Sequence, residues 1–205
     1  MVGEISHIVY AARLLSFLGE EVSHASYWNG VTFPNIRKLH VRTRHFTHPH
    51  PVSIASLTGS NDFLTGMRVH AWIDETHDRF ERHQTIAEHI PDHPLVPYAR
   101  SLAEDELLYD AFLDWDVIQK ALRTVHHDEL YYVHERASVR KWHDVLQAYF
   151  LHKPNNESRM IFSRAIGLSH AVANEANATV QALLAMPEIH QVLEGYLRDI
   201  EHTIT

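Results

Sequence analysis

Apolar residues recur three and four positions apart along almost the whole chain, and the few glycines and prolines fall between these apolar stretches. Such spacing places apolar side chains on one face of an α-helix, whereas a half-buried strand needs strict alternation. We find no convincing run of alternating, β-branched residues. The pattern therefore predicts an all-α protein, a single-domain helical bundle of about seven helices.

Capping residues, glycines and prolines predict where these helices begin and end. Residues 27–30 (Tyr-Trp-Asn-Gly) predict a loop, and residues 126–129 predict a histidine-bearing connector. The prolines and the glycine within residues 47–60 predict an irregular excursion over the surface. We expect helices over residues 6–19, from 33 onward, over 62–89, over 95–125 as one helix or a broken pair, and over 138–151, 156–186 and 187–205.

The composition narrows the functions that such a bundle supports. With 205 residues and 45% apolar content, the chain is long enough for one full hydrophobic core and needs no second domain. It has no cysteine, so any metal ion must be held by nitrogen and oxygen ligands. Its 19 histidines are dispersed, so most are expected on the surface while a few converge on a metal ion.

Charge and hydropathy bear on partners and location. The net charge of −8 argues against nucleic acid as the main partner, because phosphate backbones are bound by concentrated basic surfaces. The amino-terminal residues lack the basic and apolar segments of a secretory signal, and no stretch approaches the roughly 20 apolar residues of a membrane span. We therefore expect a cytoplasmic protein without a transmembrane segment, and the sequence leaves its oligomeric state open.

Polar residues recur at one-turn intervals on the helix predicted over residues 62–89. His70, Asp74 and Asp78 follow one another at spacings of four, and His77 lies seven positions after His70. Residues at these spacings share one face of a helix. An imidazole with carboxylates suits a borderline or hard divalent cation, so the metals that fit are Mn²⁺, Zn²⁺, Fe and Mg²⁺.

The alternative is a solvated polar face whose carboxylates are balanced by Arg68, Arg79 and Arg82. The residues around His70 favour burial instead, because this part of the helix is apolar around much of its circumference. These apolar neighbours are Met67, Val69, Trp72 and Ile73. A buried histidine beside a buried aspartate needs a partner, and that requirement favours a metal ion.

Two blocks of the sequence resemble a known family. Residues 66–78 are similar to the Gly-x3-His-x2-Ile-Asp-x3-Asp signature of bacterial acyl carrier protein phosphodiesterases, a divergent branch of the HD-domain metal-dependent phosphohydrolases. Residues 106–113 resemble that family's Asp-x3-Asp-His-Phe-Leu, and His7 is similar to its early histidine. Residues 30–36 (Gly-x3-Pro-Asn-Ile) are similar both to that family and to the helical zinc-dependent phospholipase C group. The resemblance ends near Asp116.

The resemblance implies an HD-domain-like fold with a divalent metal ion as cofactor. It implies that His70, Asp74 and Asp110 bind the metal ion directly. It also implies that His7 is a fourth ligand and that Asn35 is a further contributor. Asn35 stands where an aspartate is expected and lowers the negative charge of the site by one, and Ala111 replaces the expected histidine. Either departure is compatible with another substrate, another metal or a loss of catalysis.

Supporting roles fall to residues close to these ligands. His77 or Asp78 is the nearest candidate to orient a ligand or to transfer a proton. Arg37 and His48 are candidates to bind a substrate phosphate, because a guanidinium grips phosphate through two hydrogen bonds. An exposed loop is the alternative for the group around His48, which also includes His40, Arg42, Arg44, His45 and His50.

A third polar stripe runs along the predicted helix over residues 156–186. His170, Asn174 and Asn177 follow helical spacing in alanine-rich surroundings. The stripe can line the back of a pocket, or it can face solvent.

These observations support two classes of function. The first is a metal-dependent phosphodiesterase or phosphohydrolase acting on a phosphate ester of the phosphopantetheinyl or phospholipid type, either a small molecule or a carrier protein. The second is a non-catalytic helical binding protein that keeps a structural or vestigial metal site.

Overall fold

The computed structural model describes residues 2–18, 25–39, 44–49, 52–57, 61–83 and 93–204. Within these ranges the protein is all-α and has no strand, as the apolar pattern predicts. The described residues form eleven α-helices, whereas the sequence predicts about seven. The difference arises because the structure contains several short helices in addition to the long ones. No helix among them combines the length and apolar character needed to cross a membrane.

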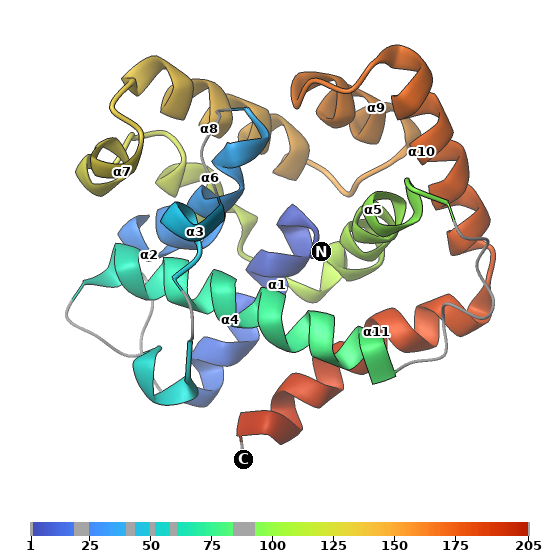
Figure 1. Cartoon of the computed structure of the whole chain (residues 1–205), viewed down its shortest axis with the longest axis horizontal. Helices are drawn as coiled ribbons and strands as arrows, with labels where there is room; N and C mark the ends of the chain where they lie inside the picture. Colours follow the sequence, from blue (N-terminus) through green and yellow to red (C-terminus); the bar gives the residue numbers. More distant parts are fainter. Residues whose placement is uncertain are drawn as a thin grey trace.

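Helix α1 (Glu4–Leu18) forms the centre of the molecule. It is apolar around most of its circumference, so it is stable only when other helices surround it. Four helices pack against it: α2 (Ala25–Thr32), α4 (Asp62–His83), α5 (Val96–Leu108) and α11 (Pro187–Ile204). In Figure 1, α1 lies near the middle of the molecule, with α4 and α5 on either side.

The remaining elements complete the layers around this centre (Figure 1). In Figure 1, α8 and α9 lie along the edge opposite α4 and α11, and α10 runs down one side beside α5. Their bounds are η1 Phe33–Lys38, α3 Arg44–Thr47, η2 Ile54–Ser56, η4 Tyr109–Ala111, α6 Trp115–Ala121, α7 His127–Tyr132, α8 Arg136–Phe150, α9 Asn156–Ala165 and α10 His170–Leu184.

The first turn of α1 is capped from α5, 99 residues further along the chain. The fully buried Asp105 carboxylate accepts hydrogen bonds from the backbone N–H groups of Glu4 (3.1 Å) and Ser6 (2.8 Å) and from the Ser6 hydroxyl (2.9 Å). These donors are among those that a helix leaves unsatisfied at its start. Burial, with the nearby Glu4 charge, raises the pKa of Asp105 to about 7.

Helices α2 and α4 cross at very close range, and the crossing corrects the loop predicted over residues 27–30. A side chain at Gly30 would collide with the backbone of Phe63, and one at Gly66 with the backbone of Tyr27. Gly30 therefore lies inside a buried helix, where it permits close approach. The sequence pattern suggested a turn, because glycine occurs both in turns and where two backbones approach closely.

Three other predicted segments differ in the structure. The helix predicted over residues 156–186 is two helices, broken at Gly167, whose φ of +97° suits glycine. The 126–129 connector begins α7. In the predicted surface excursion, Thr47, His48 and Leu57 are buried, so that prediction is wrong for these residues. The predicted end of the long helix near residue 89 lies outside the described residues, whereas the broken pair over 95–125 is confirmed as α5 and α6.

Candidate metal centre

Three imidazoles and one carboxylate meet where α1, α3 and α4 come together. His7 comes from α1, His48 from the residue after α3, and His70 and Asp74 from successive turns of α4. All four are buried, with no more than 5% of any residue exposed. His7, His70 and Asp74 each offer a ligand atom within 4.8 Å of the others.

The distances within this group match those between two ligands of one ion. His48 Nε2 lies 3.3 Å from Asp74 Oδ2, and His7 Nε2 lies 3.6 Å from Asp74 Oδ1. Two ligands at about 2.0–2.1 Å from a tetrahedral metal are about 3.4 Å apart. The His7 and His70 rings are stacked, with centroids 3.7 Å apart, and the His48 ring meets His70 edge-on at 4.9 Å.

Backbone carbonyl groups determine which ring nitrogen faces the centre. His70 Nδ1 donates to the carbonyl of Val31 at 2.8 Å, and His7 Nδ1 donates to that of Gly3 at 2.7 Å. In a neutral ring the other nitrogen, Nε2, then carries a lone pair. The Nε2 atoms of His7, His48 and His70 are all buried without a hydrogen-bond partner. Metal-binding histidines are commonly oriented through such bonds at the opposite nitrogen.

The electrostatics of His70, His48 and Asp74 favour the protonation states that a cation requires. Burial, with the neighbouring His7 and His48, holds the pKa of His70 well below its ordinary value. Burial and the two nearby arginines, Arg44 and Arg37, also lower the pKa of His48. Burial opposes the ionisation of Asp74, but its contacts with His48 and His7 outweigh this and hold its pKa well below the ordinary range. Neutral imidazoles and an ionised carboxylate bind metal ions.

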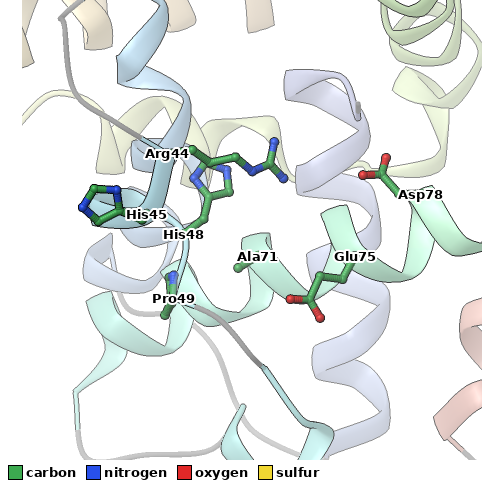
Figure 2. Close-up of a pocket in the computed structure, with 7 residues that line it drawn as sticks. All are labelled: Arg44, His45, His48, Pro49, Ala71, Glu75 and Asp78. Carbon is green, nitrogen blue, oxygen red and sulfur yellow. The ribbon is translucent and has the colours of Figure 1, made fainter.

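A cavity of about 480 Å³ opens beside the centre. Figure 2 shows Arg44, His45 and His48 on one side of it and Glu75 and Asp78 on α4 on the other. Arg44 donates to Asp74 Oδ2 at 2.6 Å although 48% of its side chain is exposed. A cationic group thus stands between the buried Asp74 and the cavity.

Two of the predicted ligands have other polar partners. The Asn35 amide donates to Glu4 Oε2 at 3.2 Å. Asp110 lies in η4, beyond the end of α5, where 69% of its side chain is exposed and its carboxylate pairs with Lys153 at 2.5 Å. The structure therefore gives no support to a direct ligand role for Asp110, because α5 ends before bringing it to the centre.

The predicted supporting residues are divided between two surroundings. His77 is buried against α5, where its Nε2 lies 3.0 Å from Glu104 Oε1. Asp78 is exposed and lines the cavity. Arg37 is near enough to lower the pKa of His48, which itself contacts Asp74.

Other predicted residues lie away from the centre or outside the described ranges. His40, Arg42 and His50 are outside the described residues. His170 and Asn174 are exposed, and their side chains contact each other at 2.8 Å, so this part of the third polar stripe faces solvent. Asn177 is partly buried, and its Oδ1 accepts a hydrogen bond from Arg159 at 2.8 Å.

The sequence did not identify His48 as a neighbour of Asp74. His48 was proposed for phosphate binding in a surface loop, whereas the structure buries it. The available signal was the tripeptide Phe46-Thr47-His48 just before a proline, which alone does not indicate a contact with α4.

The chain was compared with protein-family models, curated proteins and solved structures, and none of them matches it. The geometry of the site and the sequence motifs are therefore the features that bear on function.

Proposed function

We propose that this protein is a metal-dependent phosphoric ester hydrolase. The observation that carries the proposal is the convergence of three buried Nε2 atoms that make no hydrogen bond, from His7, His48 and His70, near the carboxylate of Asp74. Buried polar atoms without partners are costly, and a divalent cation would satisfy all four groups together.

The donor set fits a borderline divalent ion. Three nitrogens and one carboxylate, without thiolates, suit Zn²⁺, Mn²⁺ or Fe better than Mg²⁺, which prefers oxygen ligands. Such an ion, when bound, supplies a Lewis acid that lowers the pKa of water and polarises a phosphoryl oxygen.

The residues around the cavity suit a phosphate ester. Arg44 lies next to Asp74 and lines the cavity, so its guanidinium can donate to a phosphate bound there. Asp78 lines the same cavity and can exchange a proton with its contents, as the sequence suggested. The resemblance of residues 66–78 to acyl carrier protein phosphodiesterases favours a phosphopantetheinyl-type ester, and that of residues 30–36 a phospholipid-type ester.

The proposal is tested by metal analysis together with an activity assay. We expect the purified protein to contain a stoichiometric transition metal and to hydrolyse bis-p-nitrophenyl phosphate with added Mn²⁺. His70→Ala should lower both metal content and turnover by at least tenfold, because it removes an oriented ligand. His152→Ala, at an exposed position, is the matched control and should change neither. A metal-free protein whose turnover is unaffected by His70→Ala would disprove the proposal.

The second candidate is a non-catalytic protein with a structural metal ion. It is favoured by one observation: His48 contacts Asp74 beside the group of His7, His70 and Asp74. If His48 also bound the ion, four protein ligands would close a tetrahedral site, whereas catalytic zinc sites keep a position open. Asn35 and Ala111, where the resemblance expects other residues, agree with it. Under this alternative His70→Ala lowers the melting temperature of the metal-loaded protein, and no phosphate ester is hydrolysed by either form.

A further inference from the structure

A second histidine of α4 lies one turn beyond the centre and has a ring nitrogen without a partner. His77 is 2% exposed, and its Nε2 lies 3.0 Å from Glu104 Oε1. That oxygen also accepts the hydroxyl of Tyr10, so it acts as an acceptor and His77 Nε2 is the donor. In the neutral ring the lone pair is then on Nδ1, which is buried and makes no hydrogen bond.

This lone pair faces carboxylates. His77 Nδ1 lies 3.4 Å from Glu81 Oε1, the separation of about 3.4 Å expected for two ligands of one ion at about 2.1 Å. His77, Asp78 and Glu81 each offer a ligand atom within 4.8 Å of the others. Glu104 holds the opposite ring nitrogen, as carboxylates commonly do behind histidine ligands.

Three carboxylates lie near one guanidinium beside His77. Arg100 pairs with Glu81, and it lies near enough to Glu104 and Asp78 for both carboxylates to act on its pKa. Carboxylate oxygens of this kind are ligands that a divalent cation accepts beside an imidazole nitrogen.

We propose that His77 Nδ1, Asp78 and Glu81 form a second divalent-cation site, with Glu104 orienting the imidazole. Asp78 is exposed and lines the cavity, so this site is open to water and to a ligand in the cavity (Figure 2). Asp74 and Asp78 are four residues apart, about 6 Å along the helix axis. Ions of two-metal hydrolases lie about 3.5–4 Å apart, so the second site binds its ion independently of the first. The proposal does not depend on hydrolase activity.

The test is a Mn²⁺ titration in which electron paramagnetic resonance measures the free ion. We expect the intact protein to bind two Mn²⁺ per chain with different affinities. Glu81→Gln and Asp78→Asn should each weaken one binding step at least tenfold and leave the other unchanged. His70→Ala should remove the complementary step. Glu75→Gln, a carboxylate of the same helix and cavity, is the matched control and should retain both steps.

Several outcomes would overturn the second site. One is that the wild-type protein binds only one ion or none at millimolar Mn²⁺. Another is that Glu81→Gln and Glu75→Gln change the Mn²⁺ affinity equally. A third is a His77 ring that nuclear magnetic resonance shows to be doubly protonated, as an imidazolium between Glu104 and Glu81, whether or not Mn²⁺ is present. Because the His70→Ala protein is titrated as well, the second site is measured even if the first centre binds no metal.

Discussion

Two of the regions in which the protein buries histidine beside carboxylate differ in how their polar atoms are satisfied. Between α7 and α8, His143 Nε2 lies 2.7 Å from Glu129 Oε1, and both side chains are fully buried. The other oxygen of Glu129 accepts the backbone N–H of His126 at 2.7 Å, so this carboxylate has a partner for each oxygen. Among the described residues, His143 belongs to no group that could hold a metal ion.

At the centre near α4, the carboxylate of Asp74 accepts a hydrogen bond from Arg44 at 2.6 Å and is shared by two histidines at longer distances, 3.3 and 3.6 Å. Backbone carbonyls take the Nδ1 hydrogens of His7 and His70, so their Nε2 lone pairs point away from those bonds. Burial of a His–carboxylate pair therefore does not distinguish a metal centre from an internal ion pair. The distinguishing feature is how many buried ring nitrogens near one carboxylate make no hydrogen bond: His7, His48 and His70 each contribute one near Asp74, whereas in the described part of the chain only His143 Nδ1 does so beside Glu129.

Among the substitutions that test this comparison, the largest effect is expected at the His143–Glu129 pair between α7 and α8. Glu129→Ala should reduce the free energy of unfolding by about 3–5 kcal/mol, because it removes one partner of a buried pair. Denaturant unfolding measures the loss. Metal stoichiometry of the folded fraction should stay at the wild-type value, and a variant that loses its metal would show that the two regions are coupled.

A smaller loss is expected at the α2–α4 crossing. Gly66→Ala would force its new Cβ against the backbone of Tyr27 and push the helices apart. Overpacking of this kind costs about 1–3 kcal/mol. Because the carbonyl of Val31, on α2, holds His70 Nδ1, metal affinity should fall as well, as calorimetry would measure. Unchanged affinity in a destabilised variant would show that this carbonyl does not orient His70.

The smallest effect concerns pH in the metal-free protein. The pKa of His70 is lowered in the folded state, so below an unfolded pKa of about 6.5 the unfolded chain takes up the proton first. The contribution of His70 to stability is thus complete above that pH and is lost as the pH falls. Asp105, whose pKa is raised to about 7, acts in the opposite sense, since its contribution is lost as the pH rises.

The comparison with His70→Asn separates these two contributions. The amide can still donate to Val31 but does not titrate. Between pH 7 and pH 5, urea unfolding of the variant should show a smaller loss of stability than that of the wild type. Equal pH dependence in both proteins would show that His70 is not buried in its neutral form.

Periodicity predicted the parts of the fold and site that depend on local sequence. The all-α class is confirmed, and the face shared by His70 and Asp74 follows from their spacing of four on α4. Their burial follows from the apolar residues around them. Each of these properties depends on residues within a few turns of one helix.

Long-range packing determined what the sequence could not predict. The contact of His48 with Asp74 joins segments 26 residues apart, across residues without helical periodicity. The short sequence block placed Asp110 at the site, but α5 ends at Leu108 and leaves Asp110 exposed. Gly30 was interpreted as a turn because its role depends on the proximity of Phe63, which only the folded chain reveals.

The cap that Asp105 places on α1 has a consequence for the order of assembly during synthesis. The carbonyl that holds His7 Nδ1 belongs to Gly3, at the start of the turn whose N–H groups bind Asp105. His7 is made about a hundred residues before Asp105, so this turn gains its cap only after those residues have left the ribosome. A nascent chain that stops short of Asp105 would contain His7, His48, His70 and Asp74 but would lack the group that caps the first turn of α1.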